Sequence, residues 1–209
     1  MKIIDISWPL TEDTVGYKNH KKIEFKDLSK FDQANIRATR MRIGAHDGTH
    51  VDAPAHFIKE GKTIDQFPVT ATMGEAVVLE MSHVGEVISG DDLAKHEIKE
   101  GQIVLLKTTN SALSHFGEFN KGFVYLDASG AHYLVEKKVK AVGIDYLGIE
   151  RNQKGHGTHI ELFRNNVMII EGLRLAAVQA GEYFLCCLPI DVIGLASAPA
   201  RAVLVQHQD

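Results

Sequence analysis

Cysteine is scarce in this sequence of 209 residues, and long apolar runs are missing. The two cysteines, Cys186 and Cys187, are adjacent in the run YFLCCLPI, where strand geometry would point them to opposite faces. We therefore expect no disulfide between them, and free thiols suit a reducing compartment. No apolar run approaches the roughly 18 residues that a membrane-spanning helix needs. The start, MKIIDISWPL, lacks the apolar core of a secretory signal, so we expect a cytoplasmic protein.

The sequence also lacks a strong excess of charge of either sign. Lysine and arginine total 23 against 27 acidic residues, a formal net charge of -4, and the basic residues form no stripe. This balance argues against nucleic acid or a membrane of anionic lipid as the main partner. Apolar residues make up 44% of the chain and charged residues 24%, which is typical of a globular protein. Without a Pro- or Ser-rich linker, we expect one domain over residues 1–209.

Short runs rich in Val, Ile, Leu and aromatic residues recur along the chain, with Gly, Asp or Asn at many of their ends. Such runs predict strands at KIIDI near the start and at residues 36–44, 75–81, 103–108, 123–127, 140–145, 167–172, 183–190 and 201–206. Helix-like segments lie at 89–97, 128–138 and 159–166. Strand and helix mix throughout, so we predict an α/β or α+β fold with a mixed sheet.

The segment AHDGTHVDAPAHF, residues 45–57, gathers three of the eleven histidines. An even scatter would place roughly 0.6 of a histidine in an eleven-residue window. Imidazole nitrogens and carboxylate oxygens suit zinc and related divalent metals, and the lack of cysteine favours a catalytic over a closed structural site. We interpret the segment as a turn, because Gly48 and Pro54 break any helix. The candidate donors are His46, His50, Asp52 and His56.

A second and weaker cluster occupies GHGTHIELFRNNVMIIEG, residues 155–172. A helix leading into a strand would place His159 at the helix start and Glu171 at the carboxyl end of the strand, where α/β folds tend to place chemistry. His156 and Glu161 are further potential ligands. Two simpler interpretations stay open: a histidine at a helix start is often a cap, and His and Asp gather in turns by bonding their own backbone.

Other catalytic motifs fail on inspection. The closest match to a Gly-x-Ser-x-Gly nucleophile elbow is DASGA around Ser129, which lacks the first glycine. EGKTID contains Gly-Lys-Thr, but His56 stands where a phosphate-binding loop needs an earlier glycine. HEIKE at 96–100 begins like the metalloprotease helix motif and lacks its second histidine.

The segment from His46 to His56 resembles the HxGTHxDxPxH signature of the cyclase-like metal-dependent hydrolases, the family of bacterial kynurenine formamidase and isatin hydrolase. Similarity extends over almost the whole chain, through DISWPL, GKTIDQFP, HIELFRNNVMIIEGL, YFLCCLPI and SAPARAV. The spacing from His159 to Glu171 also agrees. The resemblance implies a swivelling three-layer β/β/α fold and a homodimer with active sites near the subunit contact.

The resemblance also implies which residues hold metal. It places one divalent ion on His46, His50 and Asp52, and a second on His159 and Glu171, with Asp52 and Glu171 able to bridge. The ions are expected to be two Zn²⁺ per subunit, with Mn²⁺ as the alternative. His56 becomes the acid/base. Asp47 falls at a variable position of the signature and is expected to tune the site at most.

Two departures from the family pattern surround the expected pocket. Formamidases commonly carry Trp-Pro-Gly-Asp near the start, whereas this region reads Val15-Gly16-Tyr17-Lys18-Asn19. Tyr17 could still stack against an aromatic substrate, and we take it as a substrate-binding residue. The usual Thr-Pro before the second metal histidine is Gly157-Thr158, and GIDYLGIE lacks the expected serine. These departures bear on the identity of the substrate.

The leading hypothesis is a metal-dependent amidohydrolase that converts the aryl formamide N-formyl-L-kynurenine to kynurenine and formate. Hydrolysis of a cyclic amide or lactone, as in isatin hydrolase, and a cyclase or dehydratase reaction are alternatives within the resemblance. An alternative from a different class is a metal-binding dimer without turnover.

Overall fold

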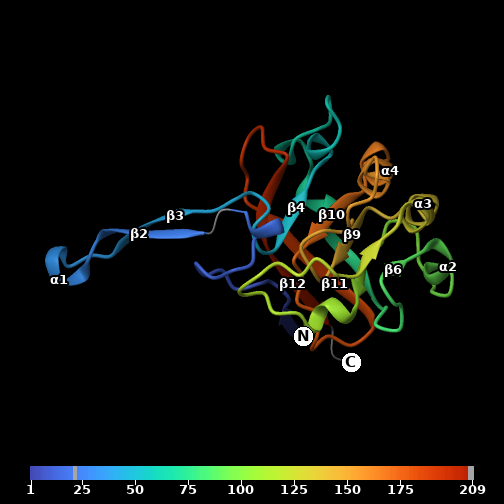
Figure 1. Cartoon of the computed structure of the whole chain (residues 1–209), viewed down its shortest axis with the longest axis horizontal. Helices are drawn as coiled ribbons and strands as arrows, with labels where there is room; N and C mark the ends of the chain where they lie inside the picture. The colour runs from blue at the N-terminus through green and yellow to red at the C-terminus, as the bar shows by residue number, and fades with distance from the viewer. Residues whose placement is uncertain (21–22, 207–209) are drawn as a thin grey trace.

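One large mixed sheet organises the chain in the computed structural model, which describes residues 1–20 and 23–206 (Figure 1). Its strands follow the order β1-β12-β11-β5-β7-β9-β10-β4, and β4 also pairs with the start of β12. Seven strands therefore close into a barrel, and β1 pairs with the far end of β12. These strands are β1 (Lys2–Asp5), β4 (His50–Asp52), β5 (Met73–Glu80), β7 (Ile103–Lys107), β9 (Ala141–Ile144), β10 (Met168–Glu171), β11 (Gly181–Pro189) and β12 (Ser197–Gln206).

Helices cover the outside of the barrel on one side only. Strands β5, β7, β9 and β10 are parallel neighbours, and the helices α2 (Gly90–Leu93), α3 (Ala128–Glu136) and α4 (Gly157–Arg164) pack beside one another along them (Figure 1). Short strands β6 (Val87–Ile88) and β8 (Tyr125–Leu126) pair nearby. None of the helices in the described ranges is long and apolar enough to cross a membrane. Single-turn 3-10 helices lie at Tyr17–Asn19, Pro54–His56, Ile64–Gln66, Val69–Ala71 and Thr109–Ala112.

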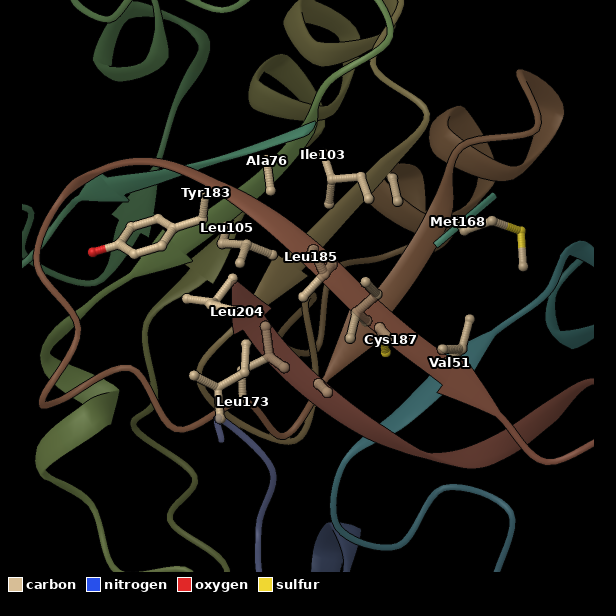
Figure 2. Packing of buried hydrophobic residues seen from close by; sticks show 14 of the residues in the cluster. Val51, Ala76, Ile103, Leu105, Met168, Leu173, Tyr183, Leu185, Cys187 and Leu204 are labelled. Atoms are coloured by element: carbon tan, nitrogen blue, oxygen red, sulfur yellow. The ribbon is translucent and has the colours of Figure 1, made fainter. Parts of the chain in front are cut away.

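Side chains along the parallel strands point alternately to the two faces of the sheet, and this divides the apolar core into two clusters. Ile103 and Leu105 of β7 point into the barrel, where they join Leu185 of β11 and other apolar side chains (Figure 2). Their neighbours Val104 and Leu106 point outward and pack against the helices. The parallel strands are thus buried on both faces, which explains their continuous apolar sequences. Antiparallel strands, parallel strands and helices form three layers, so the expected β/β/α fold is confirmed.

The predicted elements match the structure closely in the core and less well at its edges. All three expected helices form, but the one expected over 89–97 ends at Leu93. The strand expected over 123–127 is only the two-residue β8. Within the segment interpreted as a turn, residues 50–52 form β4, so that interpretation was wrong there. Cys186 and Cys187 are both free, as expected, and only Cys187 is fully buried.

A long hairpin projects from the barrel (Figure 1), and the sequence predicted only its second strand, which falls within the strand expected over residues 36–44. It consists of β2 (Glu24–Ser29), the single turn α1 (Phe31–Ala34) and β3 (Ala38–Arg42), and within residues 1–20 and 23–206 β2 pairs with no strand other than β3. We call residues 24–42 the arm. Several of its large apolar side chains are exposed, namely Phe25, Leu28, Phe31, Ile36 and Met41. An isolated two-stranded ribbon is marginally stable in water, so this arm lacks the burial that holds the rest of the sheet.

Candidate metal centre

Strand register brings three of the candidate donors to one point. His50 and Asp52 lie two residues apart on β4, so they share a face, while Val51 between them points into the barrel. β4 pairs antiparallel with β10, and Glu171 is the direct partner of His50. All three donor side chains therefore lie on the outer face of the barrel. This is the face that α4 covers.

A glycine pair and a threonine fix this register. Gly48 has a φ of 62° and Gly172 a φ of 69°, a left-handed conformation that favours glycine. A Cβ at Gly172 would collide with the carbonyl oxygen of Gly48, so the two segments approach more closely than side chains would allow. The hydroxyl of Thr49 donates to the carbonyl oxygen of Gly172 at 2.6 Å and accepts from the backbone N–H of Trp8 at 2.8 Å. These contacts explain why Gly-Thr precedes His50.

The distances among the donors fit a shared cation. Nε2 of His50 lies 3.5 Å from Oδ1 of Asp52 and 3.4 Å from Oε2 of Glu171. Nδ1 of His46 lies 2.9 Å from the same Asp52 oxygen. Ligand atoms that bind one zinc ion at about 2.0–2.2 Å are separated by roughly 3–3.5 Å. The residues present can therefore hold a divalent metal ion.

Two buried atoms of this group have no hydrogen-bond partner among the described residues. They are Nε2 of His50 and Oδ1 of Asp52, and both side chains are 1% exposed. The short contact from His46 to Asp52 does not satisfy this oxygen, because it lacks the alignment of a hydrogen bond. Leaving a buried donor or acceptor unpaired costs about 1–3 kcal/mol. A bound metal ion would satisfy both atoms at once.

The electrostatics of the group also require positive charge. Burial by itself would lower the pKa of His50, but the carboxylates of Asp52 and Glu171 outweigh it and raise that pKa to about 9. Burial would raise the pKa of Asp52, yet His50 and His46 hold it well below its usual range. Without a metal ion, a proton on His50 would supply the positive charge.

A second group of donors sits at the start of α4. Nε2 of His159 faces Oε1 of Glu171 at 3.9 Å, while Nδ1 of His159 lies 3.1 Å from Oε2 of Glu150. The other Glu150 oxygen lies 2.8 Å from Nδ1 of His156. Burial would raise the pKa of Glu150, but its contacts with the His159 side chain and backbone N–H lower it. The candidate ligand Glu161 lies elsewhere, 3.0 Å from His132.

Two orienting residues were missed by sequence reasoning. Glu150 fixes the His159 ring from behind, an arrangement typical of metal-binding histidines. Ser197 lies opposite Asp52 on β12, and its hydroxyl lies 3.0 Å from Nε2 of His46. An acidic residue at the end of the otherwise apolar run YLGIE was the only signal for Glu150. No signal marked Ser197, because its contact depends on barrel closure.

His56 lies beside the donors without joining the buried group. It ends a 3-10 helix that begins at Pro54, and its ring centroid is 4.2 Å from that of His46. Burial, aided by the neighbouring imidazoles of His46 and His159 and opposed by Asp52, lowers the pKa of His56 to about 4. A neutral imidazole at neutral pH is able to accept a proton. Its nitrogen is also close enough to His46 and Asp52 to share a metal ion with them.

All seven site residues expected from the sequence line one cavity of about 370 Å³. Tyr17, from the N-terminal part of the chain, forms part of the cavity wall. Phe57, also in the wall, stacks on His159 with ring centroids 4.2 Å apart. The cavity therefore combines a donor-rich floor with aromatic walls. The seven residues are Tyr17, His46, His50, Asp52, His56, His159 and Glu171.

Residues 4–151 match the model of a protein family described as "Putative cyclase". The chain belongs to this family. Among the relatives of this chain, the kynurenine formamidase of Bacillus thuringiensis (strain Al Hakam) is 29% identical to it over 203 residues, which cover 96% of each chain.

Solved structures agree with the cyclase assignment. One described as "potential metal-dependent hydrolase with cyclase activity" is 37% identical, with a TM-score of 0.88 over 100% of this chain and 99% of that chain. An isatin hydrolase bound to the product analogue thioisatinate has a TM-score of 0.87 over 99% of this chain and 93% of its own, at 21% identity. The latter likeness shows the shared fold alone.

Removing the buried carboxylate should abolish metal binding. We expect Asp52→Asn to lower the affinity for Zn²⁺ by more than about 100-fold. Changing a residue that only hydrogen-bonds to a ligand lowers metal affinity by about 10- to 100-fold, so loss of a ligand itself should cost more. Elemental analysis after dialysis measures the metal content. Asp47→Asn is the matched control, because Asp47 lies in the same segment and instead accepts a hydrogen bond from the Gly44 backbone at 2.6 Å. Unchanged metal stoichiometry in Asp52→Asn would show that Asp52 is not a ligand.

Glu150 should act on the metal through His159. We expect Glu150→Gln to weaken metal binding by about 10- to 100-fold, because the altered side chain orients the imidazole less firmly and no longer raises its basicity. Competition with a chromophoric chelator measures this affinity. Glu161→Gln changes a carboxylate on α4, the helix that carries His159, but this side chain contacts His132 instead of His159, so the variant should bind metal as the wild type does. Equal affinities for both variants would contradict the role of Glu150.

Proposed function

We propose that this protein is a metal-dependent hydrolase that cleaves the N-formyl bond of an aryl formamide, with N-formyl-L-kynurenine as its substrate. The observation that carries the proposal is the pair of unpartnered buried atoms on His50 and Asp52, with His56 beside them in a cavity. The full-length similarity to a kynurenine formamidase supports the choice of bond.

The donor set supports two metal ions per subunit. His46, His50 and Asp52 would hold the first ion, and His159 and Glu171 would hold the second. Zn²⁺ suits this mixture of imidazole and carboxylate, and Mn²⁺ is the alternative. When bound, the metal supplies Lewis acidity and lowers the pKa of a coordinated water from about 16 toward 7.

The chain's own residues would position the reactants and move the proton. His56 is the proposed acid/base: it takes one proton from the attacking water as the water oxygen bonds to the formyl carbon. It then returns this proton to the aryl nitrogen as the carbon–nitrogen bond breaks. Formic acid leaves and ionises to formate, and the amine leaves neutral. Tyr17 and Phe57 would line the aryl ring from the cavity wall.

Formate release in a His56 variant tests this assignment. We expect His56→Ala to keep its metal and to lose about 100- to 10,000-fold in turnover, the usual effect of removing one acid/base. Formate is measured from N-formylkynurenine, with isatin assayed in parallel, and elemental analysis gives the metal content. His132→Ala, an exposed histidine on α3, should behave as the wild type. Full activity in His56→Ala would refute the acid/base role, and loss of metal would make His56 a ligand.

We further propose that the protein is a homodimer that uses the arm. The five apolar side chains of the arm are between 42% and 61% exposed, which is unusual for a ribbon that must remain folded. A second copy would supply the missing burial. The arm leaves the barrel between Tyr17 and His46, so such a contact would lie near the site.

Changing one face of the arm should separate the proposed dimer. Phe25 and Met41 are direct partners across the ribbon, and we expect the double change Phe25→Ser and Met41→Ser to give monomers at micromolar concentration. Sedimentation velocity measures the mass. Ile193→Ser removes an apolar side chain that is 86% exposed outside the arm, and it should leave the dimer intact. A monomeric wild type, or a dimeric double variant, would refute the role of the arm.

A further inference from the structure

A second cavity adjoins the candidate metal centre. It measures about 320 Å³, and Tyr17, Lys18 and Asn152 line both this cavity and the one that holds the metal donors. We call it the side cavity. Its other lining residues are Asn19, Phe119, Lys121, Phe123 and Arg151. Nothing in the proposed chemistry at the metal requires this space.

Charge is the first unusual property of the side cavity. Lys18, Lys121 and Arg151 line it, and none of the described residues along its wall is acidic, although the chain carries a net charge of -4. Arg151 is already paired, with Glu86 at 2.7 Å. Over residues 1–20 and 23–206, neither lysine forms an ion pair with a carboxylate. The two ammonium groups thus leave positive charge available for an anion.

The lysines are carried by segments that the core holds in place. Beside Lys121, the backbone N–H of Asn120 donates to the buried Tyr146 hydroxyl at 2.8 Å. Lys18 has a φ of 50°, a left-handed conformation that is unfavourable for a residue other than glycine. The next residue, Asn19, secures this turn by accepting from the backbone N–H of Phe119 at 3.0 Å. Such conformations persist where the surrounding structure imposes them.

The floor of the side cavity is aromatic and rigid. Phe119 and Phe123 are 7% and 2% exposed, and their ring centroids are 5.6 Å apart. Tyr17 meets Phe119 edge to face at 5.0 Å, on the boundary with the metal-site cavity. A cationic rim above an aromatic floor suits an organic acid whose carbon chain is apolar.

We propose that the side cavity binds the carboxylate-bearing part of the substrate while its reacting carbonyl lies at the metal donors. Lys121 and Lys18 are then the residues that determine specificity, through charge-assisted hydrogen bonds to the carboxylate. The substrate class is an amide whose aryl group carries a short carboxylic acid chain. This inference rests on the proposed function of the metal centre, and it adds the place and the residues that would bind the carboxylate of N-formyl-L-kynurenine, away from the bond that breaks.

Kinetic discrimination tests the inference. The ratio of kcat/KM for N-formylkynurenine to that for its carboxamide should exceed one in the wild type and fall about tenfold in Lys121→Ala, mostly through KM. Lys121→Arg keeps the charge and should retain most of the ratio. Lys154→Ala changes an exposed lysine that lines neither cavity and should leave the ratio unchanged. A ratio that is equal in the wild type and in Lys121→Ala would overturn the proposal.

A binding measurement separates this inference from the proposed reaction. Isothermal titration of the metal-loaded protein with kynurenine and with kynurenine carboxamide requires no turnover, and the acid should bind about tenfold more tightly. This preference should disappear in Lys121→Ala and shrink in Lys18→Ala. If neither N-formyl compound releases formate, the proposed function fails, and the titration alone then tests whether the side cavity binds a carboxylate. Equal affinities for acid and carboxamide, or binding of inorganic phosphate without any such preference, would overturn the carboxylate assignment.

Discussion

The close approach of two glycines is the constraint on which the metal centre depends. Gly48 and Gly172 meet where a side chain would not fit, and the Thr49 hydroxyl ties the same two segments together. A slip of one residue between β4 and β10 would turn the β4 donors into the barrel and expose Val51. Register here is therefore a chemical requirement as well as a structural one.

The barrel stabilises an arrangement that would be unfavourable by itself. Closely packed imidazoles and carboxylates, two of them with unpartnered buried atoms, sit on the outer face of strands whose inner face carries a large apolar core. Burial of that inner face favours folding, while the donors alone oppose it. Glu150 and the Ile149 backbone N–H, which donates to Glu171 at 2.6 Å, then restrict how the donors can rearrange. The protein thus holds its candidate ligands in a geometry that suits a cation.

The sequence predicted the fold and the donors better than their surroundings. Core strands such as β7 carry continuous apolar runs, and the spacing of His46, His50 and Asp52 is local, so both leave a clear pattern. β4 was missed because its three residues include two polar donors and no strand-like run. Of the arm, β3 falls within the strand expected over residues 36–44, whereas β2 was missed because no core imposes alternation on it. Ser197 and the side cavity depend on contacts between distant segments, which a single sequence does not reveal.

The arm also has a thermodynamic consequence. Its two strands leave the barrel after Tyr17, in the cavity wall, and return just before His46, a candidate ligand. A second copy that binds the arm would fix the positions of Tyr17 and His46, which flank it. Dimerisation and metal binding would then be thermodynamically linked, so that dilution of the protein, which favours monomers, would also lower the affinity for metal. The hairpin would in this way make catalytic competence depend on the concentration of the chain.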